Sequence, residues 1–184
     1  MDNKIIQEYL EYLNLIHQFS VFENAVNTQR LIQNISNLLK YKFIRKDEIV
    51  TLKDEISFVD VILEIFIGKY GECVNYKSEI NGNITDVYIP NYSVLTFVEC
   101  SLFNSFESKE NNLNLNLCID YFERNIKIKI QDDNTANEYS KENTHLIDSV
   151  IFKYNSFFSM DSLIDINFNV NKNTIVKMEI PKIL

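Results

Sequence analysis

The spacing of apolar residues changes along the chain, and this change is the strongest constraint on the fold. At residues 5–19 apolar side chains recur every three or four positions, which predicts a helix with one apolar stripe. Residues 31–39 repeat the pattern, so we expect a second helix that frays into the basic run at 40–46. Two antiparallel helices cannot bury two such stripes against each other alone. The simplest second layer is another copy of the pair, which predicts a dimeric four-helix bundle.

The pattern after residue 48 predicts a mixture of helices and strands. Thr51, followed by Asp54 and Glu55, is typical of a capping box that opens a third helix, with Gly68 as its end. Period-two alternation and turn residues mark the strands, and three- to four-residue spacing marks the further helices. Strands are expected at 73–80, 113–121, 126–130, 163–170 and 174–180, and helices at 91–106 and 145–158. This order predicts an α+β fold with helices on one face of a mostly antiparallel sheet.

The composition excludes several classes of function. The 184 residues include 26 acidic and 18 basic side chains, a net charge of -8, which disfavours binding to nucleic acids or anionic membranes. All three glycines lie between residues 68 and 82, so a glycine-rich phosphate-binding loop is nearly excluded. Cys73, Cys100 and Cys118 have no C-x-x-C spacing, which favours buried thiols over metal ligands or disulfides. No apolar stretch is long enough to span a bilayer, and we expect a cytoplasmic protein.

Several segments, taken in order, resemble the sensor histidine kinases of the LytS/YehU type. They match the family motifs L-N-x-I, I-x-x-L-S-x-L-L-R-Y, V-T-L-x-x-E, L-V-E-N-A and G-T...I-P. The matching residues are 13–16, 32–41, 50–55, 97–101 and 173–181. The resemblance implies a helical dimerisation hairpin at 1–48, followed at 49–184 by a two-layer α/β sandwich of the GHKL (Bergerat) ATPase type. It also implies that the partner is a response regulator receiver domain or a genuine histidine kinase.

The departures from this family fall on its chemistry. The phosphoacceptor His corresponds to Gln7, whose amide cannot serve as a phosphoryl nucleophile. The magnesium-binding Asn corresponds to Cys100, a soft ligand that Mg²⁺ does not prefer, and a following His corresponds to Asn104. The D-N-G-x-G loop keeps Asp132 but has Asn134 in place of its first glycine. We therefore expect a pseudokinase that keeps the fold and uses neither ATP nor a metal ion.

Two retained carboxylates and one histidine leave alternatives open. Glu99 could be a general base, and Asp132 could anchor adenine. The competing interpretation is that Glu99 faces a collapsed pocket filled by aromatic residues, and that Asp132 forms a turn at a strand end. His17 is the one candidate phosphoacceptor on the predicted bundle. If His17 accepts phosphate, the chain would resemble the histidine phosphotransferases of sporulation phosphorelays, whose ATPase-like domain is also degenerate. A residual ATPase is a third possibility.

The predicted hairpin also carries candidates for partner binding. Charged and polar residues near the position of the lost phosphoacceptor could contact a receiver domain, and a basic run could contact an acidic partner. These candidates are Gln7, Glu8, Glu11, Lys40, Lys42, Arg45 and Lys46. The alternative for the basic run is a solvated helix C-terminus that compensates the helix dipole.

Overall fold

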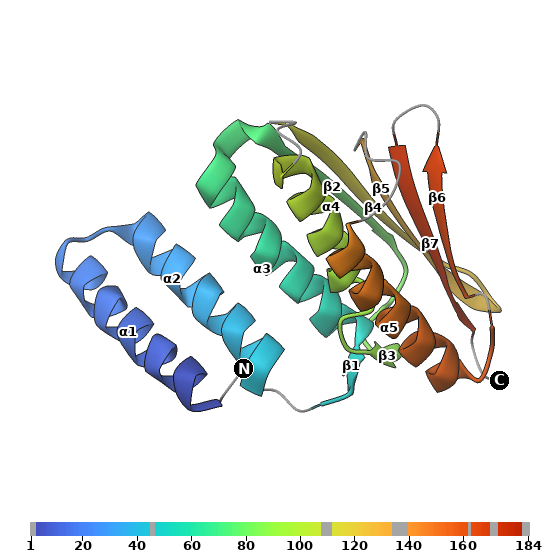
Figure 1. Cartoon of the computed structure of the whole chain (residues 1–184), viewed down its shortest axis with the longest axis horizontal. Helices are drawn as coiled ribbons and strands as arrows, with labels where there is room; N and C mark the ends of the chain where they lie inside the picture. Colours follow the sequence, from blue (N-terminus) through green and yellow to red (C-terminus); the bar gives the residue numbers. More distant parts are fainter. Residues whose placement is uncertain are drawn as a thin grey trace.

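A computed structural model describes residues 3–44, 47–107, 112–133, 140–161, 163–169 and 173–181 of the chain. Figure 1 shows two regions, a pair of helices at the N-terminal end and a set of three helices beside a sheet. Within the described residues, no helix is both long and apolar enough to cross a membrane. The mixed helix and sheet content confirms the predicted α+β class.

The N-terminal region consists of α1 (Asn3–Phe22) and α2 (Val26–Leu39), which pack against each other. A short turn joins them, and the Gln29 side-chain amide donates a 3.0 Å hydrogen bond to the Ser20 carbonyl across this turn. Both helices extend beyond the predicted apolar segments, and the added residues are mostly polar or exposed.

Helix α1 carries two apolar stripes, so the prediction of one stripe is wrong. The first stripe faces α2, and its side chains are buried or half-buried. They belong to Ile6, Leu10, Leu13, His17 and Ser20. The second stripe has side chains between 42% and 60% exposed. They belong to Ile5, Tyr9, Tyr12, Ile16 and Phe19. Each residue of the second stripe directly precedes a residue of the first, and both stripes follow the same three- and four-residue spacing. The positions of the apolar residues alone therefore suggested a single stripe.

Helix α2 ends in an ordered turn. Residues Lys40–Ile44 form a π-helical turn, η1. Tyr41 is buried there and stacks on Phe58, with 3.8 Å between the ring centroids. The predicted fraying is therefore wrong for Lys40–Ile44, because a buried aromatic ring holds this turn against the next helix. Arg45 and Lys46 lie outside the described residues.

Strand β1 (Ile49–Thr51) leads directly into helix α3 (Leu52–Tyr70). The predicted cap is confirmed, since Thr51 Oγ1 accepts a 3.0 Å hydrogen bond from the Asp54 backbone N–H. The predicted end at Gly68 is wrong, because α3 continues for two more residues. Gly71 ends it with a φ of 62°, a left-handed conformation that glycine adopts without a steric penalty.

The sheet has five strands in the order β2-β4-β5-β7-β6. The pairing of β2 with β4 is parallel and the other pairings are antiparallel, as the sequence predicted for most of the sheet. The strands are β2 (Val74–Asn81), β4 (Leu113–Tyr121), β5 (Asn125–Asp132), β6 (Ile164–Asn169) and β7 (Asn173–Pro181). A separate antiparallel pair joins β1 to β3 (Tyr88–Pro90).

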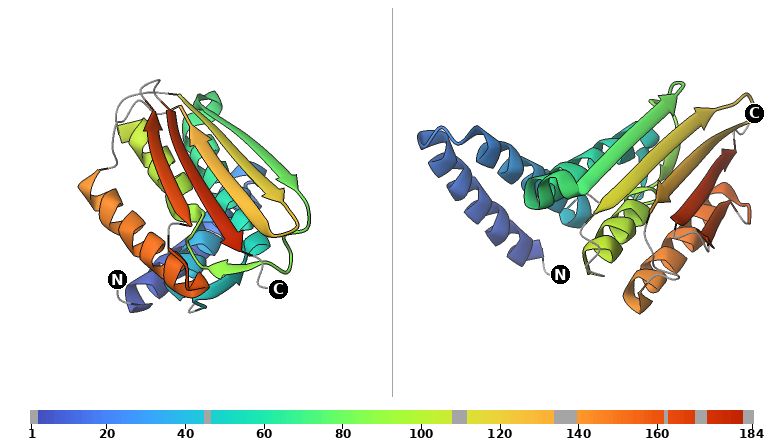
Figure 2. Two further views of the ribbon diagram at one scale, coloured as in Figure 1. Left: turned by 90° about the vertical axis from the view of Figure 1, so that its right-hand side faces the viewer. Right: turned by 90° about the horizontal axis from the view of Figure 1, so that it is seen from above.

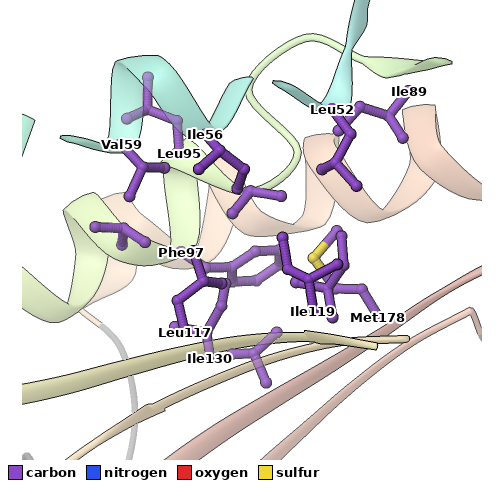
Figure 3. Close-up of a cluster of buried hydrophobic side chains, with 14 of the residues drawn as sticks. Leu52, Ile56, Val59, Ile89, Leu95, Phe97, Leu117, Ile119, Ile130 and Met178 are labelled. Carbon is purple, nitrogen blue, oxygen red and sulfur yellow. The ribbon is translucent and has the colours of Figure 1, made fainter. Parts of the chain in front are cut away.

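Helices α3, α4 (Leu95–Glu107) and α5 (Lys141–Phe158) cover one face of the sheet, and α1 and α2 extend away from it (Figures 1 and 2). Helix α4 begins four residues later than predicted, because Tyr92 has a φ of 65° and interrupts the helical backbone. Figure 3 shows the core between the layers, where Phe97 of α4 lies over the apolar side chains of the strands. These packed layers place α4 and α5 side by side above the sheet.

Candidate functional site between helices α4 and α5

A cavity of about 480 Å³ lies between α4, α5 and the turn η1. Phe103 of α4, Leu146 and Val150 of α5, and Phe43 of η1 form apolar parts of its lining. Charged and amide side chains line other parts. Because η1 ends the helical pair and α4 and α5 belong to the sheet region, this cavity contacts both regions of the molecule.

Glu99 lines this cavity and forms an ion pair with Lys42 of η1. The expectation that Glu99 faces a collapsed pocket is wrong. Two of the four aromatic side chains that were expected to fill the pocket pack elsewhere: Phe97 is buried in the core, and Phe106 stacks on Tyr70 with 3.8 Å between the ring centroids. Phe103 and Tyr92 are the two that line the cavity, and Phe103 is 43% exposed.

A second lysine lies at the cavity, on helix α5. Lys153 Nζ donates a 2.5 Å hydrogen bond to the side-chain carbonyl of Asn91. The Asn91 amide in turn donates a 2.7 Å hydrogen bond to the backbone carbonyl of Asp47. Near the other end of α5, Asn143 donates a 3.2 Å hydrogen bond to Asn104 Oδ1, which ties α5 to α4. Asn104, the residue aligned with a kinase His, therefore forms a helix-to-helix contact.

Cys100 also lines the cavity and is 2% exposed. Burial raises the pKa of its thiol to about 12, and the neighbouring Glu99 carboxylate adds to the rise. The thiol is therefore neutral near pH 7. The prediction of a buried thiol is confirmed for Cys100, whereas Cys73 and Cys118 are only half-buried. Among the described residues, no group of His, Cys, Asp and Glu is arranged to hold a metal ion.

Asp132 is the last residue of β5, which agrees with the expected strand end, and it is buried. The turn expected after it falls at residues 134–139, outside the described residues. Its carboxylate accepts a short hydrogen bond from the Ser101 hydroxyl of α4 and a 3.3 Å hydrogen bond from the Thr174 backbone N–H of β7. Ladder pairing places Asp132 opposite Thr174, which explains the second bond. Asn134, in the aligned loop that follows, lies outside the described residues.

A buried carboxylate, which the sequence pattern did not mark as a site residue, bonds the sheet region to the helical pair. Glu55 of α3 is 0% exposed and accepts the Tyr41 hydroxyl, together with backbone N–H groups at the start of α4. These N–H groups belong to Tyr92, Val94 and Leu95, at 3.2, 3.1 and 3.1 Å. Burial raises the pKa of Glu55, and the hydrogen bonds partly offset the rise. The signal that could have found it is a carboxylate on the apolar face of α3.

Tyr92 completes the junction in the opposite direction. Its hydroxyl donates hydrogen bonds of 2.8 and 3.1 Å to the backbone carbonyls of Tyr41 and Lys42 in η1. The end of the helical pair and the start of α4 are thus bonded in both directions. We call Tyr41, Glu55 and Tyr92 the junction triad. It fixes η1 beside α4, where Lys42 reaches Glu99.

Searches for related proteins find no matching family model and no matching curated protein. Solved structures do match. The histidine kinase domain of the blue-light activated histidine kinase EL346 from Erythrobacter litoralis has a TM-score of 0.51 at 10% identity, covering 97% of this chain and 95% of that one. The chain has the histidine-kinase fold. The predicted GHKL architecture is confirmed at this level.

Two further histidine kinases are similar at lower TM-scores. AdeS of Acinetobacter baumannii has a TM-score of 0.49 at 12% identity, covering 94% of this chain and 96% of that one. ThkA, in a structure of its complex with the response regulator TrrA, has a TM-score of 0.47 at 13% identity, covering 97% of this chain and 57% of that one.

The candidate partner-binding residues on the helical pair differ in their exposure. Gln7, Glu8 and Glu11 are exposed on α1, and Lys40 is exposed on η1. Lys42 is half-buried in its ion pair with Glu99, so the prediction that it belongs to a solvated basic run is wrong. Lys42 therefore contacts the α/β region of the same chain.

His17 lies on the inner stripe of α1, and its side chain is half-buried. The Ser20 hydroxyl donates a 2.7 Å hydrogen bond to the His17 backbone carbonyl, one turn earlier in the same helix. A phosphoacceptor must be reached by the carboxylate of a partner, and the packing of the inner stripe toward α2 leaves His17 only partly exposed. This placement of His17 disfavours phosphate transfer.

Proposed function

We propose that this chain is a catalytically inactive histidine-kinase-like protein that acts by binding a two-component signalling partner. The partner would be a receiver domain or a genuine histidine kinase, as the resemblance implies. The observation that carries the proposal is that both retained acidic residues are already bonded within the protein. Glu99 pairs with Lys42, and Asp132 accepts hydrogen bonds from Ser101 and Thr174.

The burial of Asp132 would oppose nucleotide binding. The residue is 3% exposed and its carboxylate already accepts hydrogen bonds from Ser101 and Thr174, so an adenine amino group would have to displace the side chains that cover it. Displacing the Ser101 hydroxyl would leave a buried donor unsatisfied, at a cost of about 1–3 kcal/mol. The neighbouring position offers no compensation, because the buried neutral thiol of Cys100 is a poor ligand for Mg²⁺.

We further propose that the protein is a homodimer built on α1 and α2. The outer stripe of α1 supports this proposal, because its five apolar side chains follow the four-and-three spacing of a coiled-coil seam. An apolar row of this length on a helix usually marks an interface. In the dimer the two copies of α1 would pack through this stripe, giving the four-helix bundle.

The partner would then dock on the surface of the helical pair that remains polar. Gln7 and Glu11 lie one helical turn apart on α1 and are exposed, and Lys40 is exposed at the other end of the pair. Binding to such a surface depends on charge and salt, and it needs no phosphoacceptor. Loss of the chemistry at Gln7 is therefore compatible with a retained docking surface.

The alternative is a histidine phosphotransferase that uses His17. Incubation of the full chain with a receiver domain phosphorylated by a small phosphodonor tests both proposals together. We expect the receiver to bind and the chain to acquire no acid-labile label. Label that appears on the wild type and disappears in the His17→Gln variant would establish the alternative. Label formed directly from MgATP would contradict inactivity.

A further inference from the structure

We propose that the cavity between α4 and α5 binds a small monocarboxylate with an apolar or aromatic body. This inference rests on the proposed function in one respect, namely that the cavity does not hold a nucleotide. It goes beyond that function, because it assigns a ligand class to a space that contacts both regions of the molecule.

The charges in the cavity favour a single negative charge. Lys42 and Glu99 neutralise each other in their ion pair. Lys153 has a neutral partner, the Asn91 side chain, and no carboxylate of the described residues forms an ion pair with it. The Lys153 residue is half-buried, and its hydrogen bond to Asn91 holds the ammonium at the cavity beside a neutral group instead of a counter-ion. A ligand carboxylate would supply that counter-ion.

A hydroxyl group lies close to this ammonium along the helix. Ser149 precedes Lys153 by four residues on α5, and both side chains line the cavity. Residues at this spacing lie on the same helix face, one turn apart. The Ser149 hydroxyl can therefore donate a hydrogen bond to the same carboxylate that pairs with Lys153. This two-point contact favours a carboxylate over a halide or another compact anion.

The apolar walls favour a ligand with a hydrophobic body. Phe43, Phe103 and Leu146 line the cavity and are 38%, 43% and 58% exposed. A ligand that covers them would remove apolar surface from water. A volume of about 480 Å³ is within the range of small-molecule sites. A polyphosphate is disfavoured, because Lys42 is already paired with Glu99 and Lys153 alone would face its several negative charges.

An NMR titration of the full chain with phenylacetate and phenylacetamide tests the proposal. The two probes have nearly the same shape and differ in charge. We expect saturable shifts from phenylacetate at Leu146 and Val150, and an affinity for phenylacetamide at least about tenfold weaker. In the Lys153→Met variant the affinity for phenylacetate should fall by a similar factor. The matched Lys129→Met variant alters an exposed lysine on β5 and should bind like the wild type.

A second variant covers the case in which Lys153→Met disturbs folding. Ser149 is exposed at the cavity, so Ser149→Phe should fill the space and abolish the shifts while the chain remains folded. Absence of saturable binding by the wild type, or equal binding of the acid and the amide, would overturn the inference and leave the proposed function intact. MgATP that displaces phenylacetate from the same resonances would overturn both.

Discussion

The alternate apolar side chains of β4 from Leu113 to Ile119 are at most 1% exposed, whereas those of the outer stripe of α1 are 42% to 60% exposed. Both rows are regular and of similar length. The sheet region covers its row with its own helices, and the helical pair has no such cover within the described part of the chain. The contrast supports the proposed dimer, in which a second copy of the chain would cover the outer stripe of α1.

The two regions pack along α2 and α3 and are hydrogen-bonded at the junction triad, and breaking the triad should have the largest effect on stability. In Glu55→Leu, three backbone N–H groups and the Tyr41 hydroxyl lose their acceptor. Each buried unsatisfied donor costs about 1–3 kcal/mol, so we expect a loss of about 3 kcal/mol or more in the free energy of unfolding. Urea denaturation measures it. Glu8→Leu, on the exposed surface of α1, is the control, and an equal loss there would contradict the role of the junction.

Substitution of charged residues into the outer stripe of α1 tests whether a second copy of the chain covers this stripe. Tyr9→Glu combined with Ile16→Glu should weaken the dimer at least about a hundredfold and leave the monomer folded, because both side chains are exposed within one chain. Analytical ultracentrifugation measures the dissociation constant. Gln7→Lys combined with Glu11→Lys, on the polar face of α1, should leave it nearly unchanged. A wild-type chain that is monomeric at micromolar concentration would contradict the proposed dimer.

The pH dependence of stability should report on the junction as well. Burial raises the pKa of Glu55 above its ordinary value of 4.5, so the folded state holds this proton more tightly than the unfolded state does. Its contribution is therefore fully present below about pH 4.5 and is lost as the pH rises through the folded-state pKa. The free energy of unfolding, measured across this pH range, should decline less with rising pH in Glu55→Gln than in the wild type. An identical pH profile would contradict the raised pKa.

The smallest effect is expected at the ion pair that spans the two regions. Lys42 and Glu99 are both partly exposed, and solvent screens their attraction. Lys42→Met should therefore reduce the free energy of unfolding by less than about 1 kcal/mol. Lys40→Met, at an exposed neighbour, should cause no measurable change in thermal unfolding. A loss as large as that of Glu55→Leu would mean that the ion pair, and not the junction triad, holds the regions together.

The sequence predicted the sheet region well because its signals are local. The alternation in β4 gave the bounds Leu113–Tyr121 that the structure has, and Thr51 marked the start of α3 correctly. The prediction that α3 ends at Gly68 was wrong, although Gly68 follows the last apolar residues of the pattern. The left-handed φ that ends α3 belongs to Gly71. The two stripes of α1 could not be separated, since both consist largely of apolar residues at one spacing.

The candidate site was harder to predict because its parts come from distant segments. Lys42 and Glu99 are separated by more than fifty positions in the chain and come together beside the buried triad in the folded structure. Without that contact, Lys42 is indistinguishable from the rest of a basic run, and Glu99 from any helix residue beside a filled pocket. Hydrophobic periodicity contains no information about which face of η1 meets α4.

Isothermal titration of MgATP into the full wild-type chain tests the claim of inactivity most directly. An active histidine kinase domain of the same fold serves as the positive control under the same conditions. We predict no saturable heat for the wild type, because Asp132 is buried and hydrogen-bonded within the protein and the Cys100 thiol is buried and neutral. A one-to-one isotherm with a micromolar dissociation constant, which corresponds to about 8 kcal/mol of binding free energy, would contradict it.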